Sequence, residues 1–202
     1  EKGWQEIEYF LDCLGTTDTS LKLVNGKAER IVLFGAGIYG EIALQHFKNK
    51  NINVLCYCDN DKKKQGKKIG GIPVISIQEL SSIDNIFVII TSRHCVSEIS
   101  QQLNDMKIDH ISFDSYFVKL MKDKYKQVYF DLLDESLSEE VFIAVLKSMI
   151  SGSLSYCGSV MEDNAFFAIP KFKNTGNEIF VDAGAYVGDT IERFIWNNIG
   201  IF

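Results

Sequence analysis

The stretch that decides the fold is Ile31-Val-Leu-Phe-Gly-Ala-Gly-Ile-Tyr-Gly-Glu41, in which four apolar residues run into three spaced glycines. A short apolar run followed by glycines and a helical pattern is typical of a strand, a tight loop and a helix. In this interpretation Gly35 lets the chain turn off the strand, Gly37 lets the backbone approach a ligand, and Gly40 lets the helix pack closely on the sheet. The N–H groups at the start of the helix would then face an anion.

A second apolar run, from Asn53 to Cys58, ends in Asp59, which lies 22 residues after Gly37. The G-x-G-x-x-G fingerprint of dinucleotide-binding folds expects an acid about 20 residues further on, where it accepts hydrogen bonds from a ribose diol. A right-handed crossover would make the two strands parallel. The spacing therefore predicts a Rossmann-like nucleotide-binding unit.

Three more apolar runs extend the expected sheet: Ile72 to Ile75, Asn85 to Thr91, and His110 to Phe113. The fold class predicted is α/β, a parallel sheet of about five strands with helices on both faces. Ser92 and Arg93 follow a strand that would be buried on both faces, so they are expected at the same crevice as the glycine loop. Ser92 has a second interpretation, as the cap of a helix from 93 to 106. The expected nucleotide-site residues are Gly35, Gly37, Ile38, Tyr39, Gly40, Asp59, Asn60, Ser92 and Arg93.

The segment after Asp59 is polar and basic as far as Gly71, with five lysines. These lysines either hold phosphates or belong to a solvated loop, and lysine runs are common on surfaces. Cys56 and Cys58 would share one face of a strand, and we interpret them as buried small hydrophobes in preference to a metal or redox pair. No metal site and no catalytic residue is predicted.

The chain of 202 residues is 46% hydrophobic and 24% charged, which suits a packed globular protein. A net charge of −6 disfavours a nucleic-acid surface. The sequence has no apolar run long enough to span a membrane and no signal-peptide core at its start, and the five cysteines suit reduced thiols. We therefore expect a cytoplasmic protein without a membrane span.

The pattern changes to helices from Tyr116 onward, and Ser136-Leu-Ser-Glu139 is expected to form a capping box. Trp4 to Leu14 has the spacing of an amphipathic helix. We expect four parts: an N-terminal helix and lead-in (1–30), a Rossmann-like nucleotide-binding domain (31–115), a helical linker (116–160), and the incomplete beginning of a second Rossmann-like domain (161–202).

A second strand–glycine–helix pattern lies at Glu178-Ile-Phe-Val-Asp-Ala-Gly-Ala-Tyr-Val-Gly-Asp-Thr190. It resembles the first motif of S-adenosylmethionine-dependent methyltransferases. Together with Phe34 to Gly40, Cys58 to Asp61 and the segment from Leu133 to Phe142, it is similar to FkbM-type methyltransferases that carry an N-terminal Rossmann-like domain. The resemblance implies S-adenosylmethionine as cofactor, a sugar, glycan or nucleotide-linked acceptor, and these cofactor-binding residues: Asp182, Gly184, Ala185, Tyr186, Gly188, Asp189 and Thr190.

The chain ends before the second strand of a methyltransferase domain, whose acid would hold the adenosine ribose. We therefore expect the chain as given to be inactive. One alternative is a nucleotide, sugar-nucleotide or NAD-binding module without methyl transfer. Another is an NAD-linked enzyme of nucleotide sugars, which lacks support because no Tyr-x-x-x-Lys pair follows the glycines. The expected partner is a small-molecule or glycan substrate, and homo-oligomerisation stays open.

Overall fold

The computed structural model describes residues 2–14, 30–162 and 179–197, so the expectations for residues 15–29 and 163–178 lie outside the described residues. The chain divides into two compact units, residues 1–160 and 161–202. The four-part division expected from the sequence stays a prediction. No helix within the described ranges combines the length and apolar character that crossing a bilayer requires.

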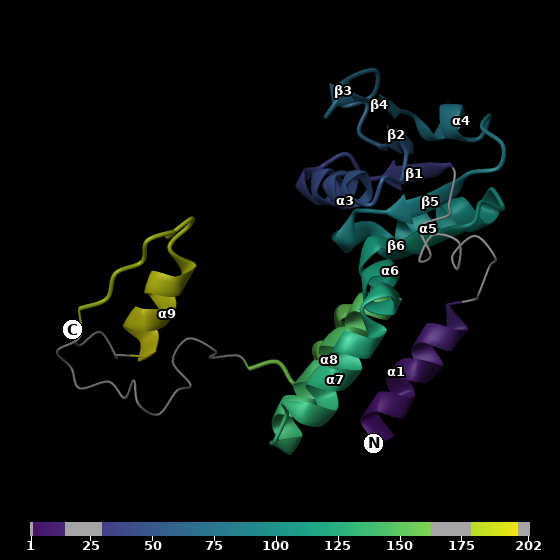
Figure 1. The fold of residues 1–202 in the computed structure, drawn as a ribbon. Coiled ribbons are helices and arrows are strands. Elements are labelled where there is room, and N and C mark those ends of the chain that lie inside the picture. The colour runs from purple at the N-terminus through teal and green to yellow at the C-terminus, as the bar shows by residue number, and fades with distance from the viewer. Residues whose placement is uncertain (1, 15–29, 163–178, 198–202) are drawn as a thin grey trace. The chain divides into compact units, whose positions relative to one another are not determined.

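A six-stranded sheet with the order β3-β4-β2-β1-β5-β6 lies at one end of the first unit (Figure 1). Its strands are β1 (Ile31–Phe34), β2 (Val54–Cys58), β3 (Lys68–Ile69), β4 (Ile72–Ile75), β5 (Phe87–Ile90) and β6 (His110–Ser112). All neighbouring strands are parallel except β3 and β4, which are antiparallel. The predicted α/β class is confirmed. The additional strand β3 lies in the lysine-rich segment, where two residues are too short to show a periodic pattern.

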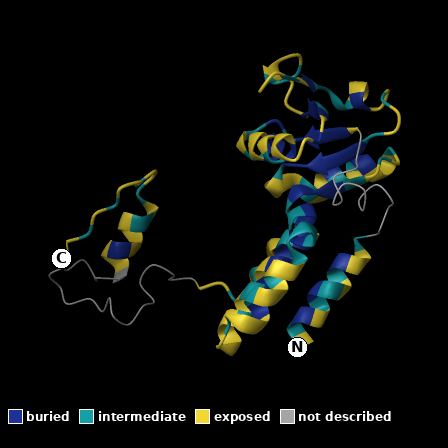
Figure 2. Cartoon of the chain, viewed as in Figure 1, coloured by how far each residue is buried: buried dark blue, intermediate teal, exposed yellow. Residues whose placement is uncertain are grey.

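The central strand β1 divides the core into two layers. Ile31 and Leu33 face one side of the sheet, and Val32 and Phe34 face the other, as the alternation of side chains along a strand requires. All four are at most 1% exposed. Figure 2 shows the central strands β1, β2 and β5 as buried almost throughout. A continuous apolar run therefore marks a strand that is covered on both faces.

Helices cover both faces of the sheet, as expected. The helices of this part are α3 (Ile38–Asn49), α4 (Ile77–Leu80), α5 (Val96–Asp105), which follows the 3₁₀ turn η1 (Arg93–Cys95), and α6 (Phe113–Leu120). Phe47 of α3 and Tyr116 of α6 pack with Leu33 on one face. Leu80 of α4 and Leu103 of α5 pack on the other.

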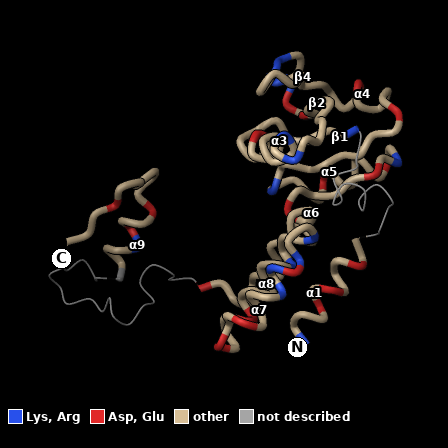
Figure 3. The backbone as a smooth tube through the Cα atoms, in the orientation of Figure 1, with Lys and Arg blue, Asp and Glu red and all other residues tan. Residues whose placement is uncertain are grey.

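A helical extension continues from the sheet. It consists of α1 (Lys2–Cys13), α7 (Lys122–Asp131), α8 (Ser136–Ser151) and the 3₁₀ turn η2 (Leu154–Cys157). Trp4, Ile7 and Leu11 of α1 pack with Leu146 and Ile150 of α8, which confirms the amphipathic pattern of the first helix. Figure 3 shows Lys and Arg interspersed with Asp and Glu over the elements of this unit.

Two cap predictions were wrong. Ser136 is the first residue of α8, with Glu135 at the cap position and no side-chain cap bond. The Glu139 carboxylate instead accepts a hydrogen bond from the Tyr129 hydroxyl at 2.8 Å, so a phenol from α7 replaces the expected serine partner. Ser92 precedes η1, but its side chain makes no cap hydrogen bond. The chain turns there through a 3₁₀ segment before α5 begins, so the geometry of an α-helical cap is not present.

In the second unit, the described helix is α9 (Asp189–Asn197). Residues 179–182 form no strand, although the sequence predicted one. A strand needs a neighbour for its backbone N–H and C=O groups, and the described residues of this unit offer none. Ile179 is 93% exposed, while Phe180 stacks on Phe194 of α9 with ring centroids 4.5 Å apart.

Leu33→Ala should lower the free energy of unfolding by about 2–5 kcal/mol, because it leaves a cavity in the middle of β1. Leu137→Ala in α8 removes the same atoms from a side chain that is 62% exposed. It should change the free energy of unfolding by less than about 0.5 kcal/mol. Urea unfolding followed by circular dichroism measures both. Equal losses in the two variants would contradict the assigned core.

Candidate functional site

The glycine loop joins the end of β1 to the start of α3, and its three glycines meet different surroundings. Gly35 has a φ of +119°, and a Cβ there would lie 3.0 Å from the Thr91 backbone. A Cβ on Gly40 would overlap the Gly35 carbonyl oxygen and lie 3.1 Å from the Tyr57 ring. A Cβ on Gly37 would meet no atom within 4 Å. The first and third glycines are therefore required by the protein itself, whereas the middle one faces open space.

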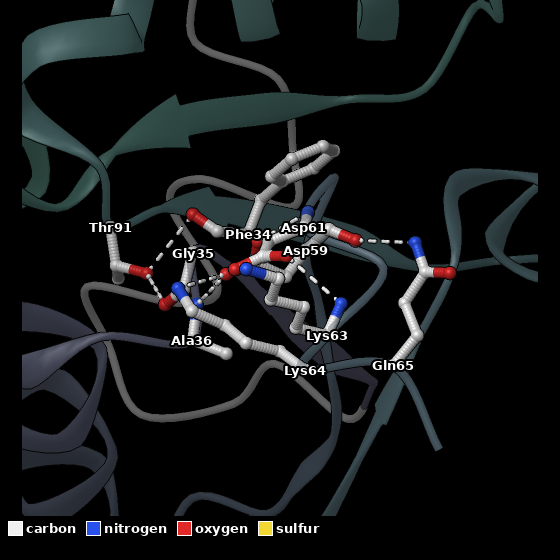
Figure 4. Close-up of polar contacts among 9 residues, drawn as sticks. All are labelled: Phe34, Gly35, Ala36, Asp59, Asp61, Lys63, Lys64, Gln65 and Thr91. Atoms are coloured by element: carbon white, nitrogen blue, oxygen red, sulfur yellow. Dashed lines mark hydrogen bonds and ion pairs between the residues drawn. The ribbon is translucent and has the colours of Figure 1, made fainter. Parts of the chain in front are cut away.

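Thr91, which directly follows β5, holds the loop from one side. Its Oγ1 hydroxyl lies within hydrogen-bond distance of two carbonyl oxygens, Phe34 O at 3.0 Å and Gly35 O at 2.8 Å (Figure 4). The Gly35 amide donates to the Cys58 carbonyl at 2.8 Å. Strands β2 and β5 thus hold the loop that leaves β1 between them.

Asp59 holds the loop from the other side. Its Oδ2 accepts from the Ala36 amide at 2.8 Å and from Lys64 Nζ at 2.9 Å, and its Oδ1 accepts from the Asp61 amide at 2.9 Å (Figure 4). The backbone carbonyl of Asp59 accepts from Gln65 Nε2 at 2.9 Å. The carboxylate that the sequence assigned to a ribose diol therefore binds the protein's own loop; its contact with a ribose stays a prediction.

The environment of Asp59 favours its charged form. Burial alone would raise the pKa, but the hydrogen bonds from the Asp61 amide, Lys64 and the Ala36 amide outweigh it and hold the pKa of Asp59 below its ordinary value. A carboxyl whose pKa is lowered by folding contributes stability at neutral pH, and this contribution is lost as the pH falls through its folded pKa. The loop is thus fastened most firmly when Asp59 is ionised.

Arg93 carries the second set of contacts around the loop. Its Nε and Nη2 donate to the two carboxylate oxygens of Asp114, each at 2.9 Å, in a bidentate pair. Nη2 also donates to the Tyr39 hydroxyl at 2.9 Å, and the guanidinium carbon lies 4.0 Å from the centre of the Tyr39 ring. The Tyr39 hydroxyl in turn donates to Asp114. Burial and this carboxylate raise the pKa of Tyr39, so the phenol stays protonated.

A pocket of about 640 Å³ opens at the carboxyl ends of β1, β2 and β5, next to the first turn of α3. This is the place where open α/β sheets bind ligands. Eight of the nine predicted nucleotide-site residues line it, and they are Gly35, Gly37, Ile38, Tyr39, Asp59, Asn60, Ser92 and Arg93. Gly40 does not, because it lies against Gly35 and Tyr57 at the contact between α3 and the sheet.

Several lining residues were not predicted, among them Lys64, Thr91, Glu98 and Gln102. Thr91 carried a usable signal, because it directly follows a buried strand on the same edge as the glycine loop. Lys64 could not be distinguished from its four neighbouring lysines by sequence. Gln102 comes from the far part of α5, where its Oε1 accepts from the Asn60 side chain at 3.2 Å.

The two cysteines of β2 behave as core residues. Cys56 and Cys58 are 4% and 0% exposed and lie in the same layer of the core. Burial raises the pKa of Cys56 to about 11 and that of Cys58 to about 12, so both thiols stay protonated. Within the described residues no cluster of metal-ligating side chains forms.

The second glycine turn holds the residues predicted for S-adenosylmethionine. The Gly184 amide donates to Asp182 Oδ1 at 3.2 Å, while Asp182 Oδ2 is buried and has no hydrogen-bond partner among the described residues. Gly188 has a φ of +83° and precedes α9. Asp189 and Thr190 lie in the first turn of α9, Tyr186 is 96% exposed, and Ala185 O accepts from the Gly188 amide. The predicted residues thus form a glycine-containing turn and the start of the helix that follows it.

A family model, a transcriptional repressor and two solved structures are similar to all or part of this chain. A family model described as "C2185-like, N-terminal" matches residues 27–112. The redox-sensing transcriptional repressor Rex of Geobacillus sp. (strain WCH70) is 39% identical over 54 residues, which is 26% of this chain and 25% of that protein. The first unit's glycine loop and strands therefore lie in a region that is similar to an established family.

The solved structures give the fold. The methyltransferase FkbM of Methylobacillus flagellatus KT superposes with a TM-score of 0.57 over 98% of this chain, at 19% identity. The chain spans 62% of the length of that protein. UDP-D-quinovosamine 4-dehydrogenase of Vibrio fischeri has a TM-score of 0.35 over 42% of this chain, at 18% identity and 76% coverage of its own length. At such low identity, the likeness to the methyltransferase shows a shared Rossmann-like fold alone.

Gly40→Ala should lower the free energy of unfolding by about 1–3 kcal/mol, because its Cβ would enter the space of the Gly35 carbonyl. Helix propensity alone predicts a higher free energy of unfolding for this variant, since alanine stabilises a helix interior relative to glycine by about 1 kcal/mol. Gly37→Ala is the control and should cost less than about 1 kcal/mol, because its Cβ meets nothing. Denaturant titration that found Gly40→Ala more stable than the wild type would contradict the close contact between α3 and the loop.

Proposed function

We propose that residues 31–115 bind a nucleotide through its phosphate groups in the pocket beside α3, with a sugar nucleotide or NAD as the ligand class. The observation that carries the proposal is the open space at Gly37, which lies in the pocket at the N-cap of α3. The first N–H groups of a helix have no partners within the helix, and its dipole favours an anion there. A phosphate group satisfies both requirements.

The rest of the pocket supports this ligand class. Lys64 and Arg93 supply positive charge, while Ile38 and Ile42 supply exposed apolar surface, at 81% and 53% exposure, for a base or sugar face. The side-chain amides of Asn60 and Gln102 supply further donors and acceptors. A volume of about 640 Å³ lies within the usual range for small-molecule sites.

We further propose that the protein to which this chain belongs transfers methyl groups from S-adenosylmethionine to a sugar, glycan or nucleotide-linked acceptor. The supporting observation is Oδ2 of Asp182, a buried atom without a hydrogen-bond partner in the described part of the chain, at a glycine turn that precedes a helix. A buried carboxylate oxygen without a donor is costly, and the amino group of S-adenosylmethionine would satisfy it. The FkbM methyltransferase fold, which this chain shares over most of its length, is in keeping with that activity.

Gly37→Val should remove nucleotide binding and leave the fold in place, because the added side chain would occupy the space that the phosphates need. Calorimetry with NAD, ADP and a UDP-sugar measures binding. Gly184→Val is a matched control, since its Cβ also meets no atom but lies in the second unit; it should bind nucleotide as the wild type does. If the wild type binds none of these compounds at millimolar concentration, the pocket is not a nucleotide site.

A protein extended through a complete second domain should bind S-adenosylmethionine, and Asp182→Ala should weaken that binding by about 10-fold to 150-fold, the effect of losing one charge-assisted hydrogen bond. The chain of residues 1–202 should bind the cofactor far more weakly than the extended protein. Isothermal titration compares the three. Absence of binding by the extended protein would defeat the methyltransferase proposal and favour a nucleotide-binding module without chemistry of its own.

A further inference from the structure

Two cations stand on opposite sides of the glycine loop. Lys64 follows β2 and Arg93 follows β5, while the loop leaves β1, which lies between these strands in the sheet. Each cation is paired with a carboxylate, Lys64 with Asp59 and Arg93 with Asp114. The two pairs differ in what else the carboxylate does. Asp59 also anchors the loop through the Ala36 amide, whereas Asp114 contacts only Arg93 and Tyr39 among the hydrogen-bond partners found in the described residues.

Described residues hold the guanidinium of Arg93 along one edge. Nε and Nη2 bind Asp114, Nη2 also binds Tyr39, and the ring of Tyr39 stacks against the group. Nη1 has no hydrogen bond to any described residue. The Arg93 side chain is 56% exposed, while that of Asp114 is 15% exposed. Releasing Asp114 would leave a largely buried carboxylate without its cation, so the pair is expected to persist when a ligand enters.

We propose that Arg93 binds the second phosphate of a diphosphate ester in this pocket and that Asp114 is the positioning residue that holds its guanidinium ready. This inference rests on the proposed nucleotide site and names the ligand class by its diphosphate group. The N-terminus of α3 offers N–H groups for one phosphate. Arg93 stacks on Tyr39, the second residue of α3. Its positive charge therefore lies beside the helix N-terminus, where the first phosphate would bind.

Asp114 comes from outside the sheet. It lies in the first turn of α6, beyond the residues 27–112 that match the family model. Helix α6 is itself fixed on two sides: Phe113 and Tyr116 pack in the sheet core, and Ser115 Oγ donates to the Ile150 carbonyl of α8 at 2.7 Å. The helical extension therefore supports the carboxylate that orients Arg93. A guanidinium fixed before binding loses less side-chain entropy when the ligand arrives.

If the ion pair were purely structural, its loss would change stability and leave the preference for diphosphates as it is. The positioning role is therefore expected to appear in ligand affinity and in the preference for diphosphates, whatever the loss of Arg93 does to the denaturation midpoint. Arg93→Lys tests whether positive charge alone is enough, because lysine keeps the charge but cannot form the bidentate hydrogen bonds with Asp114.

The test is calorimetry on residues 1–202 with inorganic phosphate, pyrophosphate, AMP, ADP, UMP and UDP. We expect the wild type to prefer each diphosphate over its monophosphate by about 10-fold or more. Arg93→Gln should abolish that preference while leaving monophosphate affinity within about 3-fold, and Asp114→Asn and Arg93→Lys should each reduce it. Glu8→Gln is the charge-matched control for Asp114→Asn, because Glu8 of α1 pairs with Lys122 and Lys126 of α7, outside the pocket; it should leave the preference unchanged.

The outcomes separate this inference from the proposed function. Nucleotide binding by the wild type without a diphosphate preference would overturn the inference and leave the nucleotide site standing. A preference that survives Arg93→Gln would do the same. Unchanged or tighter diphosphate binding by Asp114→Asn would show that Asp114 does not position Arg93. If the wild type binds no compound of the series, both proposals fail.

Discussion

The Asp59 carboxylate is the contact on which the carboxyl edge of the sheet depends. It joins the end of β2 to the glycine loop through the Ala36 amide and to the lysine-rich segment through the Asp61 amide and Lys64. A loop with three glycines has little conformational restraint of its own, so an anchor must supply it. Thr91 supplies the matching restraint from β5. With both sides fixed, the start of α3 faces the pocket in one defined geometry.

The arrangement of the strands then determines which side chains meet. Because β1 lies between β2 and β5, residues that follow these three strands converge at one edge, although Gly37, Asp59 and Arg93 are far apart in sequence. Helix α6 adds Asp114, which binds Arg93. Because α6 also packs against α8, the helical extension supports one of the residues that arrange the pocket. The pocket is thus a product of the whole first unit, including elements beyond the region that matches the family model.

The fold of this protein is observed, whereas its activity is a proposal. The Rossmann-like sheet is shared with a methyltransferase at 19% identity, and folds of this type support many unrelated chemistries. Nucleotide binding and methyl transfer are therefore proposed from particular features: the open space at Gly37 in the first unit and, in the second, Oδ2 of Asp182, which has no hydrogen-bond partner among the residues described. A single substitution changes each of these features.

The sequence alone determined the α/β class, five of the six strands and eight of the 18 residues that line the pocket, because buried parallel strands are continuous apolar runs and glycine spacing reflects backbone geometry. It could not determine the partners of the charged side chains. Glu139 bonds to Tyr129 and not to Ser136, Asp59 binds its own loop, and Asp114 reaches Arg93. Residues 179–182 form no strand despite their apolar pattern. A short-range pattern records which face of an element is apolar, whereas hydrogen-bond partners and strand neighbours come from other elements, and only the tertiary structure brings these within reach.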